Sequence, residues 1–176
     1  MNSLNTTQAK EYALNYFGGE PNDSLIYVGS DSYSAIGGNN MKYICYAWHS
    51  VPGYSAFGSY EGSDTLFVHT GFKPAFVMTK CINAPSNNQA YYSWSMFDST
   101  RSPYNSSSNP LYANMSKVEG QRAGATNTFD PADGIDFHSN GFRILSKANG
   151  EVNVGSQYHY LYMAFAEQPG AFSNAR

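Results

Sequence analysis

Residues 160–166 read YLYMAFA, and this stretch decides the fold class of the chain. Every residue in it is apolar or aromatic, so both faces of an extended strand would be hydrophobic. Such strands are typical of the centre of a sheet that is covered on both sides. Residues 43–49 read YICYAWH and have the same character up to the terminal His49. We therefore predict two central, buried strands, from Met41 to His49 and from Tyr158 to Ala166.

Outward from these two stretches, short runs of β-branched and aromatic residues recur between Gly, Pro, Asn and Ser. Runs of this kind are typical of sandwiches and jelly rolls rather than of alternating strands and helices. We predict an all-β fold, an antiparallel β-sandwich of jelly-roll type, with at most one short helix between Thr6 and Tyr16. The other predicted strands run from Ser24 to Val28, Thr65 to His69, Ala75 to Lys80, Tyr91 to Phe97, Ile135 to Phe137 and Phe142 to Leu145.

The composition and charge of the chain argue against two classes of binding partner, nucleic acids and membranes. Only 13% of the residues are charged, the formal net charge is −3, and Lys and Arg do not cluster. A protein that binds a phosphate backbone needs a basic surface, so we expect no nucleic-acid partner. The first residues do not form a basic segment followed by an apolar run, and no apolar run is long enough to span a bilayer. We expect no membrane insertion.

The two decisive stretches belong to a longer internal match. Residues 43–53 align without gaps on residues 160–170, with Tyr, Ala, Pro and Gly identical and with Ile/Leu and Trp/Phe similar in shape. Matched strands of this kind are a signature of repeats. We predict that residues 1–55 are the C-terminal part of one repeat copy, packed with a complete copy at residues 56–176 into one cooperative unit. Because a partial copy lacks strand partners, we expect identical subunits to associate through residues 1–55, as a trimer or a larger array.

Residues that could carry catalysis are scattered along the chain. The four histidines occur singly, and no nucleophile lies in a motif with a base, so we expect no enzyme and no cofactor. The strongest metal candidate is the carboxylate run of Asp130, Asp133 and Asp136. Its spacing is not that of a calcium loop, and Asp-Pro and Asp-Gly are ordinary turn formers, so we prefer a solvated turn to a bound cation.

The two cysteines do not have the spacing of a metal site or of a redox motif. Cys45 lies inside an apolar run and Cys81 directly follows one, so we expect two buried free thiols. The stretch from Asp98 to Tyr104 is interpreted as a turn in which Asp98 and Arg101 could pair.

Aromatic residues interleaved with small polar ones suit sugar recognition, because rings stack on pyranose faces while Ser and Asn bond to hydroxyl groups. Tyr92, Trp94 and Tyr104 are the candidates for a glycan site. The alternative is that Trp94 and most of the tyrosines belong to the core.

Five strings in a fixed order carry a resemblance to a known family. They are residues 54–62 (YSAFGSYEG), 70–78 (TGFKPAFVM), 97–105 (FDSTRSPYN), 135–142 (IDFHSNGF) and 160–167 (YLYMAFAE). In this order they resemble the repeat domain of uncharacterised tail-fibre and minor-tail-type structural proteins of marine tailed bacteriophages. None of the strings is a catalytic motif.

The resemblance implies a β-rich virion module that is assembled in the host cytoplasm and located in the virion. Its expected partners are identical subunits, other virion proteins and, in one interpretation, a host-surface glycan. A capsid decoration or head-fibre protein and a stand-alone carbohydrate-binding module are the alternatives.

Overall fold

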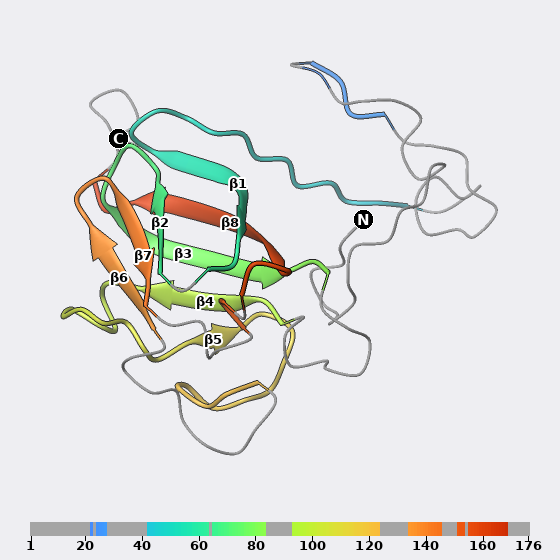
Figure 1. The fold of residues 1–176 in the computed structure, drawn as a ribbon. Helices are drawn as coiled ribbons and strands as arrows, with labels where there is room; N and C mark the ends of the chain where they lie inside the picture. The colour runs from blue at the N-terminus through green and yellow to red at the C-terminus, as the bar shows by residue number, and fades with distance from the viewer. Residues whose placement is uncertain are drawn as a thin grey trace. The chain divides into compact units, whose positions relative to one another are not determined.

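Strands provide all of the regular secondary structure in the residues that the computed structural model describes (Figure 1). These residues are 22, 24–27, 42–63, 65–83, 93–123, 134–145, 151–153 and 155–168. The chain divides into two units, residues 1 and 10–48 on the one hand and residues 2–9 and 49–176 on the other. Every described strand belongs to the second unit.

Five strands form the larger sheet. They are β1 (Ser55–Glu61), β3 (Pro74–Cys81), β4 (Ser95–Asp98), β5 (Leu111–Tyr112) and β8 (His159–Ala166), in the spatial order β1-β8-β3-β4-β5. All neighbours in this sheet are antiparallel. The strand predicted from Tyr158 to Ala166 is therefore confirmed as a central strand, with β1 on one side and β3 on the other.

Three strands form the smaller sheet. They are β2 (Leu66–His69), β6 (Ile135–His138) and β7 (Gly141–Ile144), in the order β2-β7-β6. Ser139 and Asn140 connect β6 to β7 as a tight hairpin, and polar residues of this kind favour such turns. Figure 1 shows this sheet against one side of the larger sheet.

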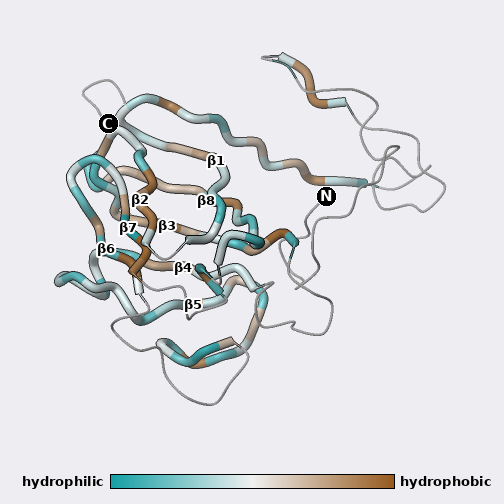
Figure 2. Tube along the Cα trace, in the orientation of Figure 1, coloured by the Kyte–Doolittle hydropathy of each residue, from teal (hydrophilic) through white to brown (hydrophobic). Residues whose placement is uncertain are grey.

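Apolar side chains from both sheets form one hydrophobic core. Fully buried members include Val77, Phe97, Tyr160 and Ala164 from the larger sheet and Ile135, Phe142 and Ile144 from the smaller one. In Figure 2 hydrophobic residues, drawn in brown, follow β2 and the strands near it. The two antiparallel sheets with a shared core confirm the predicted all-β sandwich.

The prediction of a buried strand from Met41 to His49 is wrong for its described residues, 42–49. They form no strand, and each of them is exposed, with Ile44 at 82% and Trp48 at 56%. The matched stretch 160–166 is a strand because it pairs with β1 and β3, whereas residues 42–49 pair with no strand in the described part of the chain. For the same reason the thiol of Cys45 is exposed and only that of Cys81 is buried.

The strand predicted from Ser24 to Val28 is also wrong over residues 24–27. The side-chain oxygen of Asn22 accepts the N–H groups of Ser24 and Leu25, both at 2.9 Å, which fixes a turn. The predicted strands that correspond to β2, β3, β6 and β7 are confirmed. The strand predicted from Tyr91 to Phe97 begins at Ser95 in the described residues, and β1 and β5 were not predicted.

The helix predicted between Thr6 and Tyr16 lies outside the described residues. Within the described part, no helix is long and apolar enough to cross a membrane.

Candidate functional site

The structure places the predicted glycan-binding aromatics in different environments. Trp94 directly precedes β4 and is only 7% exposed, with the ammonium group of Lys80 5.7 Å from the centre of its ring. Tyr104 lies in the loop after β4 and is 84% exposed. Tyr92 lies outside the described residues. Of the two described rings, Tyr104 is the one that offers an open face to a ligand.

Trp94 also lines a cavity of about 460 Å³. The other side chains at this cavity include Phe57 and Ser59 from β1 and Leu161 and Met163 from β8. Strand alternation puts these residues on the face of the larger sheet that points away from the core, because the core residues of β8 are Tyr160 and Ala164. The lining is almost entirely apolar, so this cavity suits an apolar group better than a charged one.

Of the three predicted metal ligands, one lies in the described part of the chain. Asp136 lies in β6, is half-buried, and stands opposite Arg143 of β7 in the strand register. Asp130 and Asp133 lie outside the described residues. Among the residues that the structure does describe, no three His, Cys, Asp or Glu side chains gather in a group that could hold a metal ion.

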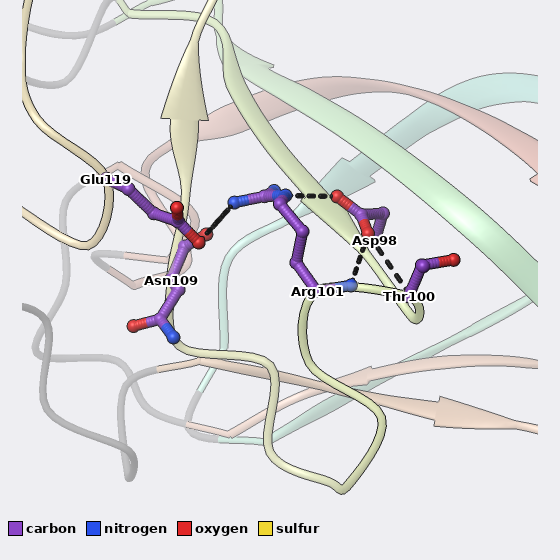
Figure 3. A network of polar contacts seen from close by, with 5 residues as sticks. All are labelled: Asp98, Thr100, Arg101, Asn109 and Glu119. Carbon is purple, nitrogen blue, oxygen red and sulfur yellow. Dashed lines mark hydrogen bonds and ion pairs between the residues drawn. The ribbon is translucent and has the colours of Figure 1, made fainter.

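Asp98 and Arg101 form the predicted pair, and it closes the turn after β4 (Figure 3). Asp98 Oδ1 accepts the N–H groups of Thr100 (3.1 Å) and Arg101 (2.8 Å), and Oδ2 accepts Arg101 Nε (2.5 Å). Burial raises the pKa of Asp98, but the Arg101 N–H groups and positive charge outweigh it, so the pKa is lowered overall. Arg101 Nη1 also donates to the Asn109 carbonyl oxygen (2.9 Å) and to Glu119 (2.8 Å). The network joins two loops and is structural.

The carboxyl group of Glu151 forms a second polar centre, and only 3% of this residue is exposed. Oε1 accepts the N–H of Ala123 (2.7 Å), and Oε2 forms a hydrogen bond with the Tyr112 hydroxyl. The same hydroxyl lies 2.8 Å from the carbonyl oxygen of Gln121. Burial raises the pKa of Glu151 to about 7, although these hydrogen bonds and the charge of Arg122 lower it. No sequence motif signals this site, because its groups come from β5 and from two segments far along the chain from it.

Residues 42–50 are an extended, exposed segment, which we call the leading segment. Its large apolar side chains are those of Ile44, Tyr46 and Trp48, which are 82%, 73% and 56% exposed. The rings of Tyr46 and Trp48 stack with their centres 6.1 Å apart, so they lie on the same side of the extended backbone. A contiguous exposed apolar surface of this kind is typical of an interaction site.

The leading segment runs into β1 through a tight turn. Val51 and Ser55 exchange backbone hydrogen bonds of 2.9 and 3.0 Å across this turn. Beyond them the backbone ladder stops, because the N–H of Phe57 donates to the Ser50 hydroxyl (3.0 Å) and the Ser55 hydroxyl donates to the His49 carbonyl oxygen (3.1 Å).

The outer edge of β1 is open after this point. The residues on either side of β1 form backbone hydrogen bonds toward β8. The Tyr54 carbonyl oxygen accepts the N–H of Ala166 (2.8 Å), and the Gly62 N–H donates to the Tyr158 carbonyl oxygen (2.9 Å). In an antiparallel strand, the backbone groups of successive residues point alternately to its two sides. Those of Ser59 and Glu61 therefore point away from β8. These outward groups have no hydrogen-bond partner in the described part of the chain.

Comparison with known proteins identifies the family but no function. The chain belongs to the family of the domain of unknown function DUF7483, whose model matches residues 1–169. No curated protein and no solved structure matches the chain.

Proposed function

We propose that this member of the DUF7483 family is a non-enzymatic structural protein of a bacteriophage virion, a tail or tail-fibre type module that assembles with identical subunits. The observation that carries the proposal is the exposed apolar leading segment, which precedes a strand with an open edge. The resemblance of five ordered strings to repeats of phage structural proteins supplies the virion context.

Three physical arguments support self-assembly. Removing a side chain such as Trp48 or Ile44 from water contributes about 1.5–3 kcal/mol, so the leading segment favours a covered state. An unpaired strand edge favours addition of a further strand. The low charge content allows identical subunits to pack without strong repulsion.

Light scattering on the purified full-length protein tests the assembly. We expect a trimer or a larger species at micromolar concentration, and dissociation when Ile44, Tyr46 and Trp48 are all replaced by Ser. Val118→Ser is the matched control, because Val118 is 70% exposed but lies far along the chain from the leading segment. A stable wild-type monomer would contradict the proposal.

Immunogold microscopy tests the virion role. Antibodies raised against the full-length protein should label the tails or fibres of phage particles from a host that carries the gene. Label on the capsid surface would instead favour a decoration or head-fibre protein. Protein that is abundant in the lysate but absent from purified particles would exclude a virion component.

A stand-alone carbohydrate-binding module is the second candidate, and the exposed ring of Tyr104 is the observation that favours it. On a glycan array, wild-type protein should bind a defined sugar and Tyr104→Ala should lose at least tenfold in affinity. Val118→Ala should bind as wild type does. An array without any signal would remove this candidate.

A further inference from the structure

We infer that residues 43–48 of one subunit add as an antiparallel strand to the open edge of β1 in a second copy of the chain. The inference rests on the proposed self-assembly and names the two strands that carry it.

The sequence of the leading segment is suited to β1. Residues 43–53 align with residues 160–170, and the latter stretch contains β8, which pairs with β1 in antiparallel orientation over the whole of Ser55–Glu61. One edge of β1 is therefore already covered by a strand of this sequence type. Its other edge, at Ser59 and Glu61, is open in the described structure.

The side chains of the leading segment define which face it would present. Ile44, Tyr46 and Trp48 alternate along the backbone, so in a strand all three lie on one face. In β1, Ala56 and Tyr60 face the core. Pairing that puts the three apolar side chains on this face extends the core of the sandwich past β1 and leaves Cys45 and Ala47 on the opposite face.

Among the registers that put these three side chains on the core-facing side of β1, one fits the neighbouring side chains best. Continuing the pairing of Val51 with Ser55 puts Ala47 opposite Ser59 and Cys45 opposite Glu61. Trp48 then faces Gly58, which has no side chain. The ring of Tyr162 covers Gly58, with Cε1 2.8 Å from where a Cβ would stand, so Trp48 would meet an aromatic surface there.

The side-chain hydrogen bonds at the turn direct this strand to a second copy. In a continued hairpin His49 and Phe57 would form the next backbone pair after Val51 and Ser55. Instead the Ser50 hydroxyl accepts the N–H of Phe57, and the His49 carbonyl oxygen accepts the Ser55 hydroxyl. These bonds end the hairpin at Val51 and Ser55, so this hairpin does not use the backbone groups of β1 beyond Phe57, and a strand from a second copy can pair with them.

Cysteine cross-linking tests the pairing and its register, because Cys45 is a natural exposed thiol. Directly opposite, hydrogen-bonded residues have Cα atoms about 5.5 Å apart, within the range that a disulfide spans. Full-length Glu61→Cys, oxidised mildly at micromolar concentration, should give reducible dimers and larger species on a denaturing gel. The same variant with Cys45→Ser is the control and should stay monomeric.

Two outcomes of the cross-linking overturn the inference. A reducible intrachain disulfide, seen as a faster-migrating monomer, would place the leading segment on β1 of its own chain. Absence of any cross-link in a sample that light scattering shows to be oligomeric would mean that the subunits associate elsewhere.

A backbone variant separates this inference from the proposed function. Ser59→Pro removes the outward N–H but no hydrogen bond to β8, so the fold is retained while the edge loses a donor. We expect the dissociation constant of the oligomer to rise at least tenfold, and Ser59→Ala to leave it unchanged. Oligomers that are equally stable in Ser59→Pro would refute the edge pairing and leave self-assembly standing. A wild-type monomer would refute both.

Discussion

At the scale of single residues, the buried hydrogen bond between Glu151 and Tyr112 depends on whether the carboxyl group of Glu151 carries a proton. The Tyr112 hydroxyl carries one hydrogen, yet both the Gln121 carbonyl oxygen and the Glu151 carboxyl group lie within hydrogen-bonding distance of it. A neutral Glu151 resolves the conflict, because its own hydrogen can point to the Tyr112 oxygen while Tyr112 donates to Gln121. The raised pKa of Glu151 agrees with this arrangement.

Glu151→Gln should therefore change the pH dependence of stability. Unfolded Glu151 loses its proton at its usual pKa of 4.5, whereas the folded protein holds it up to about pH 7. The free energy of unfolding of the wild type should fall as pH rises between these values, by about 3 kcal/mol. The neutral variant should lack this slope and be the more stable form at pH 8, as measured by urea unfolding.

Glu167→Gln is the matched control for this measurement. The carboxylate of Glu167 is 45% exposed and pairs with Lys73 at the surface, so the variant should keep the wild-type slope. If Glu151→Gln keeps the slope as well, Glu151 is not the titrating group.

Asp98 gives the opposite pH dependence. Its pKa is lowered in the folded protein, so its stabilising effect is present above its ordinary value of 3.8 and is lost as pH falls through the folded pKa. At pH 7 we expect Asp98→Ala to lower the free energy of unfolding by about 2 kcal/mol, because N–H groups lose their acceptor. Asp98→Asn keeps an oxygen acceptor and should lose about half as much. Equal losses in both variants would mean that the charge, and not the acceptor, matters.

At the scale of elements, the hydrophobic pattern predicted which stretches can be strands but not which ones pair. Residues 43–49 have two apolar faces and were predicted to be a strand, yet they have no neighbouring strand in the described structure. β1 reads SAFGSYE, whose small residues resemble a turn, and it is a strand because β8 pairs along its whole length. Pairing between positions this far apart in sequence leaves no local signal.

The contact between β2 and β7 depends on a glycine. A Cβ at Gly141, the first residue of β7, would collide with the carbonyl oxygen of Val68 and the ring of Phe67 in β2. Gly141→Ala should push these strands apart and lower the free energy of unfolding by roughly 1–3 kcal/mol. Thermal unfolding of the variant checks this.

The control for Gly141→Ala is Ser139→Ala in the adjoining turn, which is exposed and should change stability by less than about 0.5 kcal/mol. A melting temperature of Gly141→Ala equal to that of this control would show that β2 and β7 adjust without cost.

At the scale of the whole molecule, the fold class was predictable from sequence because most strands carry large apolar side chains on their core side. The Glu151 site was not predictable, since Tyr112 of β5, Ala123 and Glu151 are far apart in sequence and meet only in the folded chain. The glycan and metal candidates remain predictions, since Tyr92, Asp130 and Asp133 lie outside the described residues.

The sandwich should fold without a metal ion or a disulfide. The two sheets share a core of buried apolar side chains, and Cys45 and Cys81 are not bonded to each other. Thermal melts with a chelator and with a reductant should therefore superimpose on the untreated melt. A drop of more than a few degrees with chelator would make Asp130, Asp133 and Asp136 metal ligands.

The position of β8 bears on how the protein is made. β8 is the last described strand along the chain, but it lies between β1 and β3 and joins them. A ribosome releases β1 and β3 long before it releases residue 166, so the larger sheet cannot close until β8 has also been synthesised. Until β8 emerges, the edges of β1 and β3 that it covers lack their native partner. Premature termination before β8 would therefore remove the link between β1 and the paired strands β3, β4 and β5.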